Sequence, residues 1–292
     1  MSNRLTYLIT GATGTVGSLV VDALLARNAK VRAFVRDREK AVARFGAQVE
    51  VCTGNLTDAG SLKAALEGAD AVFLVNAGPD LAAHDEAAAK VAKESGVAHL
   101  VKLSSYDALE CVGTGKWHAR GEAAIRASGV PFTFVQPSGF MSNALFWARS
   151  IQAAGVVRAC TGEGRIPFIH PRDIADVATE ALGSPRFRGE ALPITGPESL
   201  SYAEMAAKIG AAVGRTIRFR AISEDEVRQS MLESGDSQAV IDAHLSIYRA
   251  IREQRLARVT DTVQRVLGRN PITFDEWVDQ NAAAFAELAP VA

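Results

Sequence analysis

Apolar residues gather in short runs that alternate with amphipathic segments over the first half of the chain. The clearest continuous run is Ala71–Val75, and the strand-like segments Lys30–Val35, His99–Leu103 and Pro131–Gln136 are mixed with a few polar residues. Continuous apolar runs of this length are typical of strands covered on both faces, and the segments between them have helical spacing. Strands that alternate with helices in this way predict an α/β fold with a parallel sheet.

The first of these strand and helix units carries three glycines between its two elements. The strand runs into the segment Gly11-Ala12-Thr13-Gly14-Thr15-Val16-Gly17. In this context Gly11 permits a tight turn, Gly14 lets a pyrophosphate approach the backbone, and Gly17 lets the helix lie close to the strand. The free N–H groups of a helix N-terminus bind phosphate. The segment therefore predicts a dinucleotide site formed by Gly11, Thr13, Gly14, Thr15 and Val16.

The end of the second strand decides which nicotinamide nucleotide is preferred. An acidic residue there holds the ribose 2′-hydroxyl of NAD, whereas an arginine accommodates the 2′-phosphate of NADP. Here Arg36 comes first and Asp37 follows. Asp37 also suits a helix N-cap, and both residues could simply belong to a solvated charge cluster. The order of the two favours NADP over NAD.

The loops after the later strands supply the other candidates, because ligands of such sheets bind at the carboxyl ends of the strands. Asn55 and Leu56 are predicted to flank the adenine, although Asn55 would also suit a plain turn. The remaining cofactor candidates are Asn76, Ala77, Ser104 and Pro137, the last two bordering the nicotinamide. His84, in the helix that follows Asn76 and Ala77, is expected on the surface. The predicted fold is a Rossmann-type doubly wound sheet.

The regular alternation ends near residue 140. We expect a dinucleotide-binding domain at 1–140 and a smaller, substrate-facing α+β region at 141–292 that packs on it, with a helix at about 144–153. Apolar side chains at the start of the second region either line a slot beside the nicotinamide or serve as core. They are Phe140, Met141, Phe146 and Trp147.

Composition limits the classes of partner. The chain has 292 residues, 48% of them hydrophobic and 22% charged, with a net charge of −1, so nothing favours nucleic acid or a membrane surface. No apolar stretch reaches the roughly 20 residues of a membrane span. The three cysteines are far apart and lack metal-ligand spacing, and the first strand leaves no room for a signal peptide. We therefore expect a cytoplasmic protein without a metal.

A proton donor is harder to find. Short-chain dehydrogenases use a Tyr-x-x-x-Lys pair on a helix, but none of the four tyrosines is followed by lysine at that spacing. Counting from Ser104 places the pair at Trp117 and Gly121. Tyr106 and His118 are the catalytic candidates, since histidine can donate a proton near neutral pH. Alternatively, His118 only packs or caps against Glu122.

Several motifs together resemble the NmrA-like group of atypical short-chain dehydrogenases. The matching segments are Thr10–Gly17, Val35–Asp37, Leu103–Ser105, Trp117–His118 with Glu122, Ser128–Thr133, Gln136–Asn143 and His170–Ala175. The resemblance implies NADPH, because similar members include quinone reductases, triphenylmethane and azo dye reductases and isoflavone-reductase-like enzymes. The last of these carry a catalytic lysine where this chain has His118. The group also contains NADP-sensing regulators without turnover.

These observations lead to one hypothesis and two alternatives. The hypothesis is an NADPH-dependent oxidoreductase that transfers hydride to a planar, electron-poor small molecule such as a quinone or dye. An apolar slot then supplies orientation, and water can protonate the product. The alternatives are a non-catalytic NADP sensor, and a carbonyl or imine reductase of a biosynthetic intermediate with His118 as the acid. A homodimer is compatible with the helices expected at the surface.

Overall fold

The computed structural model describes residues 4–286, which form two compact units that alternate along the chain. Unit 1 comprises residues 4–109, 115–136 and 171–193, and unit 2 comprises 110–114, 137–170 and 194–286. The sequence predicts one boundary at residue 140 and misses the return of the chain to unit 1 with α7 (Pro171–Gly183). This helix returns because most of its apolar face is buried against α1, β4 and β5 of unit 1.

Unit 1 is built on a seven-stranded sheet with the strand order β3-β2-β1-β4-β5-β6-β9. The strands are β1 (Thr6–Thr10), β2 (Lys30–Val35), β3 (Glu50–Thr53), β4 (Ala71–Leu74), β5 (His99–Leu103), β6 (Phe132–Pro137) and β9 (Ala191–Ile194). The pairings from β3 to β6 are all parallel. This order is that of a doubly wound dinucleotide-binding sheet, so the predicted fold class is confirmed.

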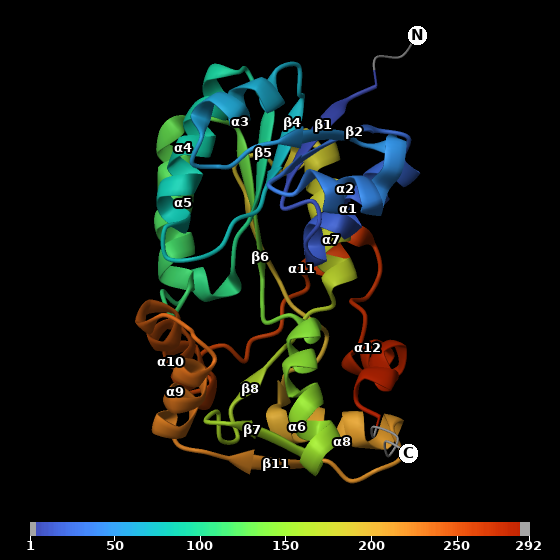
Figure 1. Ribbon diagram of the computed structural model, residues 1–292, viewed down its shortest axis with the longest axis vertical. Helices are drawn as coiled ribbons and strands as arrows, with labels where there is room; N and C mark the ends of the chain where they lie inside the picture. The colour runs from blue at the N-terminus through green and yellow to red at the C-terminus, as the bar shows by residue number, and fades with distance from the viewer. Residues whose placement is uncertain (1–3, 287–292) are drawn as a thin grey trace. The chain divides into compact units, whose positions relative to one another are not determined.

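Helices cover both faces of this sheet (Figure 1). They are α1 (Thr15–Ala26), α2 (Arg38–Phe45), α3 (Ala59–Leu66), α4 (Leu81–Glu94), α5 (Gly115–Ser128) and α7, with short 3₁₀ turns η1 (Gly46–Gln48), η2 (Tyr106–Ala108) and η4 (Pro185–Phe187). Helix α4 packs on α5, and α1 packs on α7. Leu8, Leu74, Leu100 and Phe134 belong to the core cluster that the sheet forms with α3, α4 and α5.

The first turn is as tight as the glycine pattern predicts. Gly11 has a φ of +58°, a conformation that favours glycine. The N–H of Gly14 donates to the Gly11 carbonyl oxygen at 2.9 Å. A Cβ on Gly17 would lie 2.2 Å from that oxygen, so only glycine lets α1 start against the turn. No side chain caps α1 at Gly14, which leaves the N–H groups of its first turn open.

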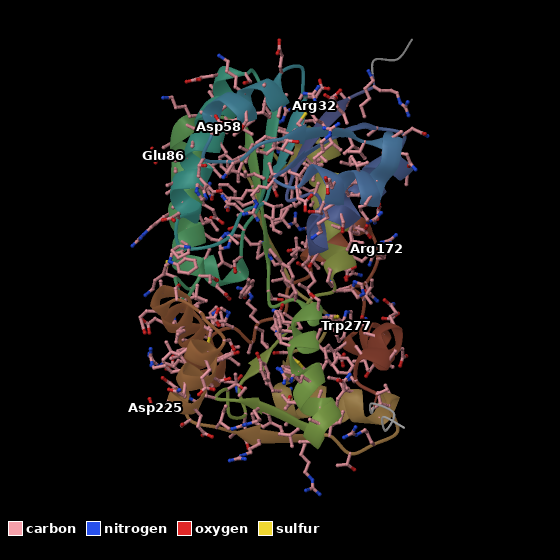
Figure 2. The ribbon with its side chains drawn as sticks, viewed as in Figure 1. Arg32, Asp58, Glu86, Arg172, Asp225 and Trp277 are labelled. Carbon is pink, nitrogen blue, oxygen red and sulfur yellow. The ribbon has the colours of Figure 1, made fainter. Side chains whose placement is uncertain are left out.

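Side-chain caps fix where several other helices begin. Asp58, labelled in Figure 2, accepts hydrogen bonds from the N–H groups of Gly60 and Ser61 and starts α3. In unit 2, Ser201 caps α8 (Tyr202–Ala212) through a reciprocal capping box with Glu204.

Unit 2 consists of short strands and helices. They are η3 (Met141–Trp147), α6 (Ala148–Ala154), β7 (Val156–Ala159), β8 (Arg165–Ile166), β10 (Leu200–Ser201), α8, β11 (Arg218–Ala221), α9 (Glu224–Glu233), α10 (Gln238–Arg252), α11 (Thr262–Leu267), α12 (Phe274–Asn281) and η5 (Ala282–Ala284). The helix expected at 144–153 is in fact a 3₁₀ segment followed by α6. Parallel pairing joins β7 to β11, and antiparallel pairing joins β8 to β10.

Candidate functional site

A pocket of about 560 Å³ lies in unit 1 where β1, β2, β3 and β4 end. The predicted cofactor residues that line it are Gly11, Thr13, Arg36, Asn55, Leu56, Asn76 and Ala77. They come from four separate loops, which the parallel strands bring to one edge of the sheet. Lys40 from α2 and His84 from α4 also line the pocket.

The other predicted cofactor residues lie outside the lining of this pocket. Gly14, Thr15 and Val16 form the start of α1, where Val16 is buried and its side chain packs in the core. Ser104 follows β5 and is 5% exposed. Pro137 is the last residue of β6 and belongs to unit 2. Their roles toward a nucleotide therefore stay predictions.

The wall of the pocket after β4 is anchored to β1. The Val75 N–H donates to the hydroxyl oxygen of Thr10 at 2.7 Å, and the same hydroxyl lies 3.0 Å from the Val75 carbonyl oxygen. Thr10 is buried, so these hydrogen bonds hold the ends of two neighbouring strands in register. The pocket thus has a fixed floor between the glycine turn and the loop after β4.

The two charged residues that follow β2, Arg36 and Asp37, have different surroundings. The Asp37 carboxylate accepts a hydrogen bond from the Lys40 N–H at 2.9 Å and caps α2, so the predicted N-cap is confirmed. Arg36 is exposed, lines the pocket and makes no hydrogen bond or ion pair with any residue from 4 to 286. Its guanidinium is consequently available to a phosphate, which it can hold through paired N–H groups.

His84 is a pocket residue that the sequence analysis places on the surface instead. It is half-buried on α4, and it lines the pocket together with Ala77. The missed signal was its position in the first turns of the helix that follows β4. In a parallel sheet, such a helix begins at the same edge as the loops that bind ligands.

A buried ion pair lies behind the loop after β4. Lys102 Nζ on β5 is 2.6 Å from Asp85 Oδ2 on α4, and both side chains are 0% exposed. Burial raises the pKa of Asp85 and lowers that of Lys102, while each partner opposes the shift of the other. Asn76 Nδ2 donates to the second oxygen of Asp85 at 2.8 Å. The sequence analysis missed both Lys102 and Asp85.

A second buried carboxylate lies on α5. Ser104 Oγ donates to Glu122 Oε1 at 2.5 Å, and Gln136 Nε2 donates to the same oxygen at 2.8 Å. All three side chains are buried. The hydroxyl proton of Ser104 is therefore engaged with a carboxylate at the carboxyl end of β5.

The two candidates for a proton donor differ in environment. Burial and the charge of Lys102 lower the pKa of His118 to about 3, so its ring is neutral near pH 7. Tyr106 is 5% exposed in η2. Asp107, which the sequence analysis did not consider, has its pKa raised to about 7 by burial. Any proton from His118 would have to come from a neutral imidazole.

The four apolar candidates for substrate contact all belong to unit 2 and have different surroundings there. Met141 is 1% exposed and is core. Trp147 packs with Tyr202 at a ring distance of 4.8 Å. Phe140 bridges to Ile169, whereas Phe146 is 86% exposed. Only Phe146 therefore presents a large open apolar surface, and substrate contact by any of the four stays a prediction.

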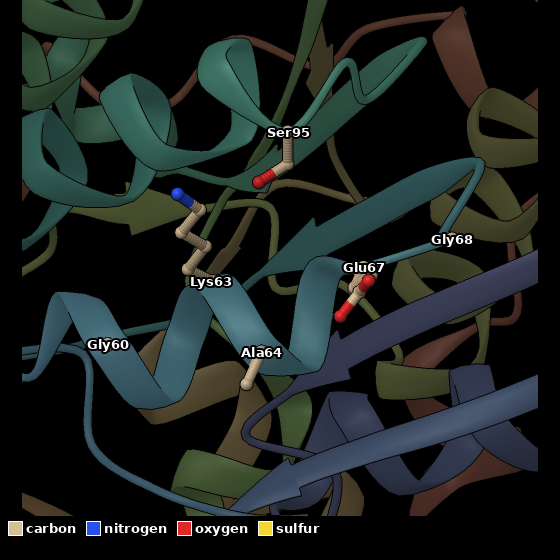
Figure 3. A pocket seen from close by; sticks show the side chains of 6 residues that line it. All are labelled: Gly60, Lys63, Ala64, Glu67, Gly68 and Ser95. Atoms are coloured by element: carbon tan, nitrogen blue, oxygen red, sulfur yellow. The ribbon is translucent and has the colours of Figure 1, made fainter.

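A second hollow of about 440 Å³ lies beside α3. Lys63 on α3 and Ser95 at the end of α4 point toward one another there (Figure 3). None of the residues predicted for a site lines it. Its lysine and glutamate are exposed and belong to an ordinary charged surface.

Other classes of site find no support within residues 4–286. No group of three or more His, Cys, Asp or Glu side chains could hold a metal ion there. In the same range, no helix has the length and apolar character that crossing a membrane requires. Cys52, Cys111 and Cys160 form no disulfide in this part of the chain.

Comparison with known proteins yields strong matches over most of the chain. A family described as NAD(P)H-binding matches residues 11–185. A "NAD(P)H azoreductase" of Xenophilus azovorans is 38% identical over 281 residues, which cover 95% of this chain and 98% of the relative. A "(4-alkanoyl-5-oxo-2,5-dihydrofuran-3-yl)methyl phosphate reductase" of Streptomyces griseus is 39% identical over 284 residues, or 96% and 99% of the two chains.

Solved structures share the fold. A NADPH-dependent quinone oxidoreductase of Escherichia coli, complexed with NADPH, aligns with a TM-score of 0.86 at 22% identity. The alignment covers 94% of this chain and 99% of that one. The likeness therefore extends over both units and is a likeness of fold.

Proposed function

This chain belongs to the NAD(P)H-binding family, and from that premise we propose that it is a reductase that transfers hydride from NADPH to a planar, electron-poor acceptor such as an azo dye or a quinone. The family resemblance predicted from the motifs is confirmed. The observation that carries the substrate class is the 38% identity to an azoreductase along almost the whole of both chains.

The residues of unit 1 fit a nicotinamide dinucleotide. A side chain at Gly17 would collide with the Gly11 carbonyl oxygen, one at Gly11 would be strained at its positive φ, and the uncapped start of α1 offers N–H groups to a pyrophosphate. Arg36 and Lys40 supply positive charge at the pocket, and Asp37 is already engaged as a helix cap. This division of charges supports a preference for NADPH over NADH.

Bound NADPH would supply the hydride, and the chain's own residues would bind and orient the nucleotide and the acceptor. The start of α1 would hold the pyrophosphate and Arg36 the 2′-phosphate. Ser104 is predicted to border the nicotinamide, and its hydroxyl already donates to Glu122. An azo or quinone acceptor needs little acid from the protein, because water can protonate the reduced product.

The first prediction concerns turnover. Purified protein is expected to oxidise NADPH in the presence of at least one member of a panel of azo dyes, triphenylmethane dyes and quinones, followed at the NADPH absorbance band. A Gly17→Val variant is the negative control, since its Cβ would collide with the Gly11 carbonyl oxygen. Binding of NADPH without oxidation by any acceptor would favour the NADP sensor instead.

A second candidate is reduction of a carbonyl-conjugated biosynthetic intermediate. It is favoured by the relative from Streptomyces griseus, whose name describes a ring that carries oxo and alkanoyl groups and a methyl phosphate. For this reaction we expect an acid of the protein, such as His118, to donate a proton to the reduced product. The next variant separates the two candidates.

The second prediction is that His118→Asn keeps kcat/KM for a dye or quinone within about threefold. The pKa of His118 is about 3, so the imidazolium is absent near pH 7 and the pH–rate profile should show no inflection at 6.5. The same change at His244, on α10 of unit 2, is the control. A loss of 10² to 10⁴, the usual range for a general acid, would contradict this prediction and support the carbonyl-reductase candidate.

A cytoplasmic location and a homodimer stay predictions, as does contact of the substrate with Phe146.

A further inference from the structure

The Lys102–Asp85 pair has no place in the hydride transfer proposed above, yet it connects directly to the nucleotide pocket. Asp85 receives a hydrogen bond from Asn76, and Asn76 lines the pocket. We propose that Lys102 and Asp85 are positioning residues for the nucleotide, which act through Asn76 to hold the wall formed by the loop after β4. The inference rests on the nucleotide binding of the proposed function and not on the acceptor.

Two anchors hold this wall. On one side Thr10 binds the backbone of Val75. On the other side Asn76 Nδ2 donates to Asp85 Oδ1 at 2.8 Å and lies 3.4 Å from the Leu81 carbonyl oxygen. The chain then turns at Gly78, where φ is +100°. Without Asp85, the Asn76 side chain would keep only its longer contact with the Leu81 carbonyl oxygen, and Val75 would be the stronger of the two anchors.

The Asp85 carboxylate can act as this anchor only because a cation neutralises it inside the fold. Asp85 and Lys102 are each 0% exposed, and a carboxylate alone in such a place would take up a proton. Lys102 comes from β5, where the residues on either side of it are apolar and buried. An acceptor that is charged and fixed binds the Asn76 amide more strongly than a neutral one.

The neighbouring helix leaves room for the carboxylate. A Cβ on Gly121 of α5 would lie 2.0 Å from Asp85 Oδ2. Gly121 stands where the spacing from Ser104 would place the lysine of a Tyr-x-x-x-Lys pair. Helix α5 therefore has a glycine where such a pair would have its lysine. The absence of a side chain at Gly121 leaves the space in which Asp85 pairs with Lys102 of β5.

Two neutral versions of the pair isolate the hydrogen bond to Asn76. In D85N/K102M residue 85 keeps an oxygen that can accept from Asn76 Nδ2, whereas in D85L/K102M it has none. Asn and Leu are close in size, and both double variants remove the two charges of this pair together, so neither leaves one of them unpaired and both should fold. We expect the Kd for NADPH, measured by fluorescence titration without acceptor, to stay within about threefold for D85N/K102M and to rise about tenfold for D85L/K102M.

Two further variants complete the experiment. N76A should raise the Kd about tenfold, and adding N76A to D85L/K102M should change it by less than about twofold, because both remove the same contact. T133V is the stability control: it removes a buried hydroxyl that bonds to His99 and to the Phe187 carbonyl oxygen, away from the pocket. It should lower the unfolding temperature and leave the Kd unchanged.

The proposal is overturned if D85L/K102M binds NADPH as tightly as the wild type, or if its Kd rises no more than that of D85N/K102M. Multiplying effects of N76A and D85L/K102M would also overturn it. These measurements need no turnover, so a protein that binds NADPH but reduces no dye would contradict the proposed function and leave this result standing. Failure of the wild type to bind NADPH would instead remove the premise of both.

Discussion

The Lys102→Met variant is expected to be less stable than the wild type by about 3 to 5 kcal/mol, the usual cost of removing one partner of a buried ion pair. Asp85 would remain 0% exposed without its counter-charge. Methionine keeps the length of the side chain, so the loss would come from charge and not from an empty volume. The midpoint of urea unfolding, followed by circular dichroism, measures the change.

Restoring neutrality should restore stability. The D85N/K102M double variant is expected to recover most of the loss, because replacing both buried charges by neutral groups of similar size is often neutral or stabilising. Lys93→Met is the matched control: Lys93 is an exposed residue on α4, and its ammonium donates to the Gly129 carbonyl oxygen at 2.9 Å. This control should shift the free energy of unfolding by less than about 0.5 kcal/mol. A Lys102→Met variant as stable as the control would show that Asp85 does not need the cation.

The Lys102–Asp85 pair shows which features of the fold can be predicted from the sequence and which cannot. The strand His99–Leu103 is predicted with its observed bounds, because its apolar pattern is a local property. The role of Lys102 within it is not local. A lysine inside a buried strand signals a buried partner, but the partner lies on an alanine-rich helix, and only the packing of α4 on β4 and α5 identifies it as Asp85.

The proposed nucleotide pocket was predictable to a greater extent, since every loop at the carboxyl edge of a parallel sheet is a candidate for ligand binding. Gly11, Arg36 and Asn76 meet around one pocket as that rule implies. Lys40 and His84 were missed because they lie on α2 and α4, the helices that follow these loops in the chain, and not in the loops themselves. The division of the chain was missed for a related reason: α7 reaches unit 1 through long connections, and no local pattern shows where its apolar face is buried.

In the sequence, Arg36 and Asp37 stand side by side, so either of them could contact the ribose of the nucleotide. The structure assigns different work to each: Asp37 caps α2, and Arg36 faces the pocket without a partner among residues 4–286. An aspartate bound to its own helix can still accept a ribose hydroxyl, but its carboxylate is already shared. The proposed preference for the phosphorylated nucleotide is therefore attributed to the Arg36 guanidinium.

The Arg36→Ala variant is therefore expected to raise the Kd for NADPH about a hundredfold, which corresponds to about 2.8 kcal/mol. A guanidinium that holds a phosphate makes two charge-assisted hydrogen bonds, each of which contributes about 1.5 to 3 kcal/mol before solvent screening. The Kd for NADH, which has no 2′-phosphate, should change by less than about threefold. Fluorescence titration with each nucleotide gives both values.

Arg38→Ala is the matched control for that experiment, because it removes the same charge two residues away. The Arg38 guanidinium donates to the Val51 carbonyl oxygen at 2.9 Å and does not line the pocket. A general effect of positive charge would weaken NADPH binding equally in both variants and would fade as salt screens it. A specific phosphate contact would separate them, with Arg36→Ala weakened far more than Arg38→Ala at every ionic strength. Equal losses in the two variants, or an equal loss of NADH binding in Arg36→Ala, would place the 2′-phosphate elsewhere.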